Sequence, residues 1–190
     1  MHAAAWIITD LGDLFVASAA GLVLVVWTWF NLGRMVSLAF WTCHAATFGL
    51  VTLIKLWTGR NLPQPDQVAL WQPSAGAPSG HTAMATIVYG CAAAIFLKAG
   101  RGPLAALGAA LSFAAIAAVA VTRVTLHTHS AADVAAGLAI AGGFAALFVR
   151  VLSVRIQDQA PPMGGLLAAL LVVVALALVS RVRISSLGVF

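Results

Sequence analysis

The sequence is poor in charge. Charged residues make up only 8% of its 190 residues, glutamate does not occur, and all five acidic residues are aspartate. Soluble domains average about 25% charged residues, because a folded chain in water must present polar side chains to the solvent. The composition therefore excludes an ordinary soluble domain, and the 62% of hydrophobic residues indicates a membrane protein.

Cysteine is also scarce. Cys43 and Cys91 lie within apolar segments and have neither a CxxC partner nor the spacing of metal ligands. This pattern predicts two buried, unreactive thiols. The N-terminus lacks a basic n-region and a cleavage site, so we expect no removable signal peptide.

The basic residues exceed the acidic ones and give a net charge of +5. They sit singly at the ends of apolar runs, which is typical of residues that anchor and orient membrane helices. This distribution argues against nucleic acid as a partner and favours membrane lipids.

Six apolar stretches are long enough, or nearly so, to cross a bilayer core of about 30 Å as helices. We therefore expect an all-α integral membrane bundle of about six transmembrane helices, forming a single domain over residues 1–190. The expected spans are about 14–30, 36–57, 82–97, 104–121, 134–149 and 166–179. Residues 3–11 are too short to span and are expected to lie in the membrane interface.

The two longest polar connections, 58–78 and 122–133, emerge on the same face of such a bundle. Five basic residues fall near each face, but two on the face with the loops, Lys55 and Arg123, have a chemical role proposed below. Setting these aside leaves more positive charge on the opposite face, which favours loops that face outward. We expect a bacterial cytoplasmic membrane with the loops towards the periplasm or cell exterior.

The first chemical motif is Pro78-Ser79-Gly80-His81, directly before the third span. A Ser-Gly pair at a helix N-terminus offers free N–H groups and the positive end of the helix dipole, both of which suit a phosphate. An ordinary serine cap with an interfacial histidine is the alternative interpretation.

The second motif is Arg123-x5-His129-x3-Asp133. One helical turn separates His129 from Asp133, so the carboxylate can fix the imidazole tautomer and leave the other ring nitrogen free to attack. Arg123 can clamp phosphate oxygens through its planar guanidinium. Ser130 and Asp133 also fit a helix capping box, and this interpretation stays open.

Lys55 lies at the outer end of the second span, where lysines commonly extend towards the interface. Taken with the other two motifs, it completes a pattern that resembles the type 2 phosphatidic acid phosphatase superfamily, over roughly residues 55–137. The family pattern reads K-x6-R-P, P-S-G-H and S-R-x5-H-x3-D. The segments that match it are Lys55-x6-Leu62-Pro63, Pro78-Ser79-Gly80-His81 and Thr122-Arg123-x5-His129-x3-Asp133.

The chain departs from this pattern at two positions. Leu62 stands where the family has arginine, and Thr122 stands where it usually has serine. Arg60, two residues before Leu62, is a candidate to supply the missing guanidinium from a shifted turn. The missing arginine puts the full phosphate clamp in doubt but leaves the nucleophile and the acid in place.

The resemblance implies a phosphatase that works through a phosphohistidine. His129 is expected to attack phosphorus, Asp133 to orient and stabilise it, and His81 to protonate the leaving oxygen and then activate water. The residues expected to hold the phosphate oxygens are Lys55, Ser79, Gly80 and Arg123, with Arg60 as a further candidate. No cluster of acidic residues is present for magnesium, so we expect neither a metal nor another cofactor.

The substrate is expected to be an amphiphilic lipid phosphate that enters from the membrane leaflet, because the loops are too short to form a separate binding domain. Polyprenyl pyrophosphate, phosphatidylglycerol phosphate, phosphatidic acid and phosphorylated lipid A all fit. Two alternatives stay open: a lipid phosphotransferase on the same scaffold, and a non-enzymatic lipid scrambler or transporter with a decayed site. Short loops argue against the haloperoxidases of the same superfamily.

Two further histidines have weaker predictions. His127 is expected to be solvated. His44 lies three helical turns below Lys55 on the same side of the second span, and a hydrogen bond to a neighbouring helix explains it at least as well as a functional role.

Overall fold

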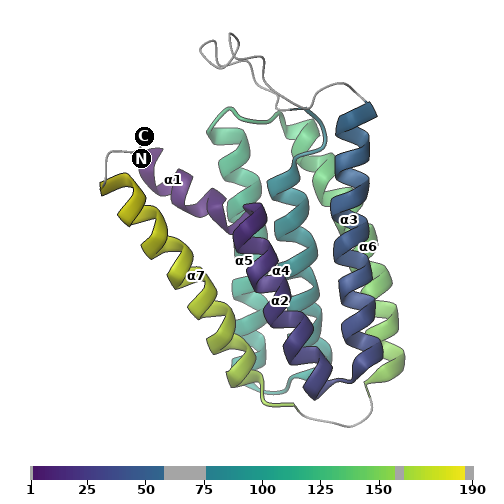
Figure 1. The fold of residues 1–190 in the computed structure, drawn as a ribbon. Coiled ribbons are helices and arrows are strands. Elements are labelled where there is room, and N and C mark those ends of the chain that lie inside the picture. Colours follow the sequence, from purple (N-terminus) through teal and green to yellow (C-terminus); the bar gives the residue numbers. More distant parts are fainter. Residues whose placement is uncertain (1, 58–75, 157–160, 187–190) are drawn as a thin grey trace.

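The computed structural model describes residues 2–57, 76–156 and 161–186. Within these ranges the chain forms seven α-helices and one 3₁₀ helix, and no strand (Figure 1). In chain order they are α1 (His2–Thr9), η1 (Asp10–Gly12), α2 (Leu14–Asn31), α3 (Arg34–Trp57), α4 (Gly80–Ala99), α5 (Pro103–Thr125), α6 (Ala131–Arg155) and α7 (Met163–Ser186).

Five of the helices in the described ranges, α2 to α6, are long and apolar enough to cross a membrane, and α7 adds a shorter apolar stretch, Met163–Leu176. The prediction of an all-α membrane bundle with about six spans is confirmed. The spans begin earlier than hydropathy alone predicted, because polar residues cap them: α4 starts at Gly80 and α6 at Ala131.

Helix α4 forms the centre of the bundle (Figure 1). Its most apolar window is 83% buried, whereas the corresponding windows of the other four long helices are 22–28% buried. It packs against α2, α3, α5, α6 and η1.

The bundle exposes apolar side chains and buries polar ones, as expected of a surface that meets lipid. Phe15, Phe30 and Trp57 are each at least 80% exposed. Buried hydroxyls donate back to their own helix: Thr28 to the carbonyl of Leu24 at 2.6 Å and Thr47 to that of Cys43 at 2.8 Å. These bonds satisfy polar groups that would otherwise be costly in an apolar environment.

Glycine allows α4 to approach its neighbours closely. A Cβ on Gly108 would lie 2.6 Å from the ring of Phe96, and one on Gly137 would lie 2.7 Å from the carbonyl oxygen of Ser79. Small residues let membrane helices pack backbone to backbone. The second contact brings the start of α6 against the start of α4, which is where the motifs meet.

The connections place the motif-bearing helix ends together. Figure 1 shows the end of α3, the start of α4, the end of α5 and the start of α6 at one end of the bundle. Between α5 and α6 the chain turns through His127, whose φ of 53° lies in the left-handed region. Ser130 then caps α6.

Candidate active site

Ser79 is the N-cap of α4 and is fully buried. Its hydroxyl oxygen accepts hydrogen bonds from the hydroxyl of Thr82 at 3.0 Å and from the N–H of Thr82 at 3.4 Å. Its own N–H donates to the carbonyl oxygen of Asp133 at 2.9 Å. By helix geometry the N–H groups of Gly80 and His81 have no acceptor within α4, so they remain available to an anion.

The predicted nucleophile, His129, lies in the connection between α5 and α6 and is only 4% exposed. Its Nδ1 is 3.7 Å from Oδ2 of Asp133. This distance is longer than a hydrogen bond, and Nδ1 has no hydrogen-bond partner among the described residues. The carboxylate therefore faces Nδ1 without a hydrogen bond, in a position to stabilise positive charge on the ring.

Asp133 is engaged as a helix cap. Its Oδ2 accepts from the N–H of Ser130 at 3.0 Å, and its N–H donates to the hydroxyl of Ser130 at 3.2 Å. The structure thus contains the capping box that the sequence left open. The carboxylate serves the start of α6 and also faces His129.

Arg123 holds the loop that carries His129. Its carbonyl oxygen accepts from the N–H of His129 at 3.1 Å, the N–H of Thr128 at 3.2 Å and the hydroxyl of Thr128 at 3.0 Å. The Arg123 side chain is only 6% exposed, and its Nε has no hydrogen-bond partner within the described part of the chain. A buried guanidinium with an unused donor suits an anionic ligand.

Lys55 reaches the start of α4 from the end of α3. A Cβ on Gly80 would lie 3.7 Å from Nζ of Lys55. Lys55, Gly80 and His81 line one pocket of about 230 Å³, together with apolar side chains of α2, α3 and α4. The half-buried His81 and the ammonium of Lys55 therefore face the same space.

The environment keeps His129 neutral. Burial, the largest cause, and the positive charges of Arg123 and Lys55 together lower the pKa of His129 to about 4, with Asp133 partly offsetting them. At neutral pH the imidazole is therefore uncharged. A proton on Nδ1, the side that faces Asp133, leaves the lone pair of Nε2 free to act as a nucleophile.

Three residues at the site were missed by sequence reasoning: Thr9, Gly12 and Asp13. Nη1 of Arg123 donates to the hydroxyl of Thr9 at 3.2 Å, Gly12 lies against the backbone of His81, and Asp13 lines the pocket with Lys55 and His81. The sequence offered only a weak signal, a short polar run of threonine and aspartate before the first span.

Some predicted features lie elsewhere or outside the described residues. Arg60, Leu62 and Pro63 fall within residues 58–75, which the structure does not describe. Among the described residues no group of three or more His, Cys, Asp or Glu side chains is arranged to hold a metal ion. Cys43 and Cys91 are buried and free, as expected.

His44 is buried away from the site. Its ring stacks on Trp41 with centroids 6.2 Å apart and packs against Phe40 at 5.8 Å. Nδ1 of His44 has no hydrogen-bond partner in the described ranges, so the expected bond to a neighbouring helix is not found at this atom. His127, in contrast, is exposed.

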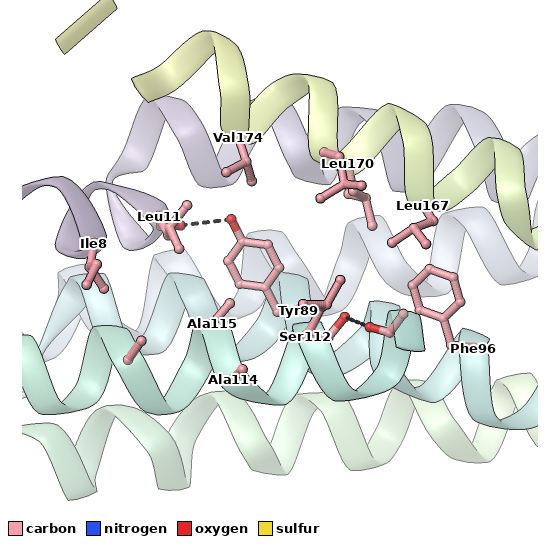
Figure 2. A pocket seen from close by; sticks show the side chains of 14 residues that line it. Ile8, Leu11, Tyr89, Phe96, Ser112, Ala114, Ala115, Leu167, Leu170 and Val174 are labelled. Atoms are coloured by element: carbon pink, nitrogen blue, oxygen red, sulfur yellow. Dashed lines mark hydrogen bonds between the residues drawn. The ribbon is translucent and has the colours of Figure 1, made fainter. Parts of the chain in front are cut away.

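A second pocket, of about 310 Å³, lies between α1, α4, α5 and α7 (Figure 2). Its walls are almost entirely apolar, and among the described residues Tyr89 is the only titratable side chain that lines it. Of the predicted site residues, Lys55, Gly80 and His81 line the smaller pocket instead.

Comparison with known proteins matches the larger part of the chain to one family. A family model described as the PAP2 superfamily matches residues 34–157. The match includes α3 to α6 and every motif residue discussed above, and it excludes α1, η1 and α2. No curated protein and no solved structure matched the chain.

Proposed function

Because the chain belongs to the PAP2 superfamily, whose members are generally phosphatases, we propose that it hydrolyses a phosphomonoester or pyrophosphate carried by an amphiphilic lipid. The observation that carries this proposal is the proximity of four groups near the start of α4. Lys55 and His81 line one pocket there, and the charges of Arg123 and Lys55 act on His129, whose partner Asp133 accepts a hydrogen bond from the N–H of Ser79 through its carbonyl oxygen. Phosphoryl transfer needs a nucleophile, an acid and positioned cations, and all of these meet here.

In the first step, Nε2 of His129 attacks phosphorus and forms an N–P bond as the bond from phosphorus to the leaving oxygen breaks. His81 takes up a proton when the anionic phosphate binds beside it, because a nearby negative charge favours the charged imidazole, and it gives this proton to the leaving oxygen. Asp133 faces Nδ1 and stabilises the positive charge that develops on the ring of His129.

In the second step, the now neutral His81 takes a proton from water. The resulting hydroxide attacks phosphorus, the N–P bond breaks, and inorganic phosphate leaves with His129 restored to its neutral form. No metal takes part, because fixed cations and N–H groups of the protein stabilise the transferred group.

The equatorial phosphate oxygens are held by the guanidinium of Arg123, the ammonium of Lys55 and the N–H groups at the start of α4. The hydroxyl of Ser79 orients this turn by accepting from Thr82. Arg60 stays a candidate for a further cation.

The pocket favours a lipid as the leaving group. Beside His81 and Lys55 it is lined by Phe48, Val51 and Met84, which continue towards the apolar part of the bundle. A phosphate at the polar end and a hydrocarbon along these side chains describe an amphiphile. Polyprenyl pyrophosphate, phosphatidylglycerol phosphate and phosphatidic acid are the candidates, acted on at the outer face of a bacterial cytoplasmic membrane.

The test is release of inorganic phosphate by the purified protein in detergent, with these three lipids and with EDTA present. We expect release from at least one lipid, undiminished by EDTA. If no lipid in the panel yields phosphate, or if EDTA abolishes the release, the proposed reaction is wrong.

A lipid phosphotransferase is the second candidate, favoured by Leu62 in place of the family's arginine. It uses the same first step, but a lipid hydroxyl replaces water in the second. The same assay separates the two when a lipid acceptor is added: a hydrolase releases phosphate equal to the substrate consumed, whereas a transferase forms a phosphorylated acceptor instead.

A further inference from the structure

The segment that precedes the first long helix reaches the predicted phosphate site. It comprises residues 9–13, which we call the N-terminal segment, and it lies outside the part of the chain that the family model matches. Helix α1 packs against α5, and η1 packs against α4 and α5. The segment therefore contacts two of the three helices that carry predicted phosphate ligands, α4 and α5.

The hydroxyl of Thr9 accepts a hydrogen bond from Nη1 of Arg123 at 3.2 Å. Thr9 is 2% exposed and Arg123 is 6% exposed, so water competes little for this bond. A hydrogen bond to a charged group is stronger than one between neutral groups, and a buried one restricts the side chain to a single orientation. Thr9 thus fixes the direction in which the guanidinium of Arg123 points.

Gly12 sets the distance between the segment and α4. A Cβ at this position would overlap the carbonyl oxygen of His81 and would lie 2.9 Å from Cγ1 of Val119 on α5. Only glycine permits this approach. The backbone at His81 is therefore in direct contact with the same segment that holds Arg123.

The segment is anchored from its other side. Figure 2 shows the hydroxyl of Tyr89 pointing to the carbonyl oxygen of Leu11, to which it donates at 3.2 Å. Leu11 and Ile8 border the apolar pocket beside Tyr89. Two residues after Leu11, Asp13 caps α2 by accepting from the N–H of Phe15 at 2.9 Å. The segment is held at both ends and is rigid enough to position a side chain.

Resting on the proposed function, we propose that the N-terminal segment is a fourth part of the active site, in which Thr9 is a positioning residue that orients Arg123 towards the phosphate. Thr9 does not touch the substrate. It acts on phosphate affinity through the guanidinium, so its removal weakens binding of any ligand that carries a phosphate at this site.

The test compares Thr9→Val, which removes the hydroxyl but keeps the shape, with Thr9→Ser, which keeps the hydroxyl. Thr28→Val is the matched control, because Thr28 is also buried and its hydroxyl bonds only to carbonyls of its own helix. Two quantities are measured on each purified variant: kcat/KM for a hydrolysed lipid phosphate, and the inhibition constant of inorganic phosphate.

For Thr9→Val we expect kcat/KM to fall about tenfold and the inhibition constant for phosphate to rise by a similar factor, the usual effect of losing one charged hydrogen bond. Thr9→Ser and Thr28→Val keep both quantities near the wild-type values. The inhibition constant does not depend on the fraction of protein that is folded, so a purely structural role of Thr9 would leave it unchanged. An unchanged constant in Thr9→Val therefore overturns the inference.

The experiment distinguishes an error about Thr9 from an error about the proposed reaction. If the wild-type protein releases phosphate and Thr9→Val behaves like it, only the role of Thr9 is wrong. If the wild-type protein hydrolyses no lipid, phosphate binding is read from the rise in unfolding temperature that inorganic phosphate causes. A rise that is reduced in Thr9→Val alone supports the inference, and a rise equal in all variants contradicts it.

Discussion

The two ends of Arg123 are held by different regions of the molecule. Its carbonyl oxygen accepts hydrogen bonds from Thr128 and His129, five and six residues further along the chain. Its guanidinium is bonded to Thr9, which lies 114 residues earlier. One end is therefore organised by the local turn after α5, and the other by packing of α1 against α5.

The local and the long-range hydrogen bonds of Arg123 have different structural effects. The local bonds place the predicted nucleophile relative to the backbone of α5, and they depend on contiguous residues alone. In the proposed reaction, the long-range bond from Thr9 orients the guanidinium of Arg123 towards the phosphoryl group on His129, and this bond forms only when α1 packs on α5. The residues that position the nucleophile and the residue that orients the cation therefore lie in separate parts of the sequence.

Replacing Arg123 removes both the guanidinium and its bond to Thr9, and it has the largest expected effect on kcat/KM. We expect Arg123→Ala to lower kcat/KM by about a hundred- to a thousandfold, the usual cost of losing one donor to developing negative charge. Arg150→Ala is the matched control, because Arg150 is exposed on α6 and is expected to leave the rate unchanged. A small loss in Arg123→Ala, comparable with that in Arg150→Ala, would contradict a role in phosphate binding.

The local region is tested next through Asp133. The Asp133→Asn variant keeps an oxygen to accept from Ser130 but loses the charge that faces His129, and we expect kcat to fall on the order of a hundredfold. Ser130→Ala instead removes the hydroxyl of the cap, which costs about 1 kcal/mol of stability. Rates and unfolding temperatures of both variants separate the two roles of Asp133, and equal rates in both would show that the carboxylate is only a cap.

The long-range region is tested through Gly12. Gly12→Ala forces a methyl group against the carbonyl of His81, and relief by moving η1 shifts the neighbouring Thr9. Overpacking of this kind costs about 1–3 kcal/mol of stability. Because the displaced Thr9 loses its bond to Arg123, we expect kcat/KM to fall about tenfold, as in Thr9→Val. Gly142→Ala, where a Cβ would meet nothing within 4 Å, is the control. Full activity in Gly12→Ala would show that contact between the segment and α4 does not matter.

The smallest effect concerns the protonation of His129. Its pKa is lowered to about 4, mainly by burial and then by Arg123 and Lys55. Because the shift is downward, the neutral form persists as the pH falls from neutrality and is lost only near pH 4. Hydrogen–deuterium exchange at the imidazole C2 position, read by mass spectrometry, is expected to show a midpoint near pH 4, and Arg123→Ala is expected to raise it. A midpoint at the ordinary value for histidine, in the native protein, contradicts the buried, cation-flanked environment.

The fold class and the convergence of the motifs could be predicted from the sequence because both depend on short-range patterns. Long apolar runs specify spans, and the motif around His129 falls within a single connection and one helical turn. Hydropathy alone places the starts of α4 and α6 too late, whereas the cap residues Ser79 and Ser130, both visible in the sequence, mark where these helices begin.

The role of Thr9 could not be predicted in the same way. A lone threonine before a span has no periodicity or spacing that marks it, and its partner becomes its neighbour only when α1 packs on α5. The central position of α4 also arises from tertiary packing, because every span in this chain is apolar. The carboxylate of Asp133 can accept from the N–H of Ser130 or from Nδ1 of His129, and the sequence does not indicate which bond forms. In the structure it bonds to Ser130 and lies 3.7 Å from His129.

The most direct test of the central claim is to trap the covalent intermediate. The purified protein is mixed with a lipid substrate labelled at the phosphorus in the presence of EDTA, quenched in alkaline denaturant, and mapped by mass spectrometry. We predict an alkali-stable, acid-labile phosphoryl group on His129 that does not form in His129→Ala. Phosphate release by the wild-type protein with no label on His129 at any quench time, or equal release by His129→Ala, would contradict the account.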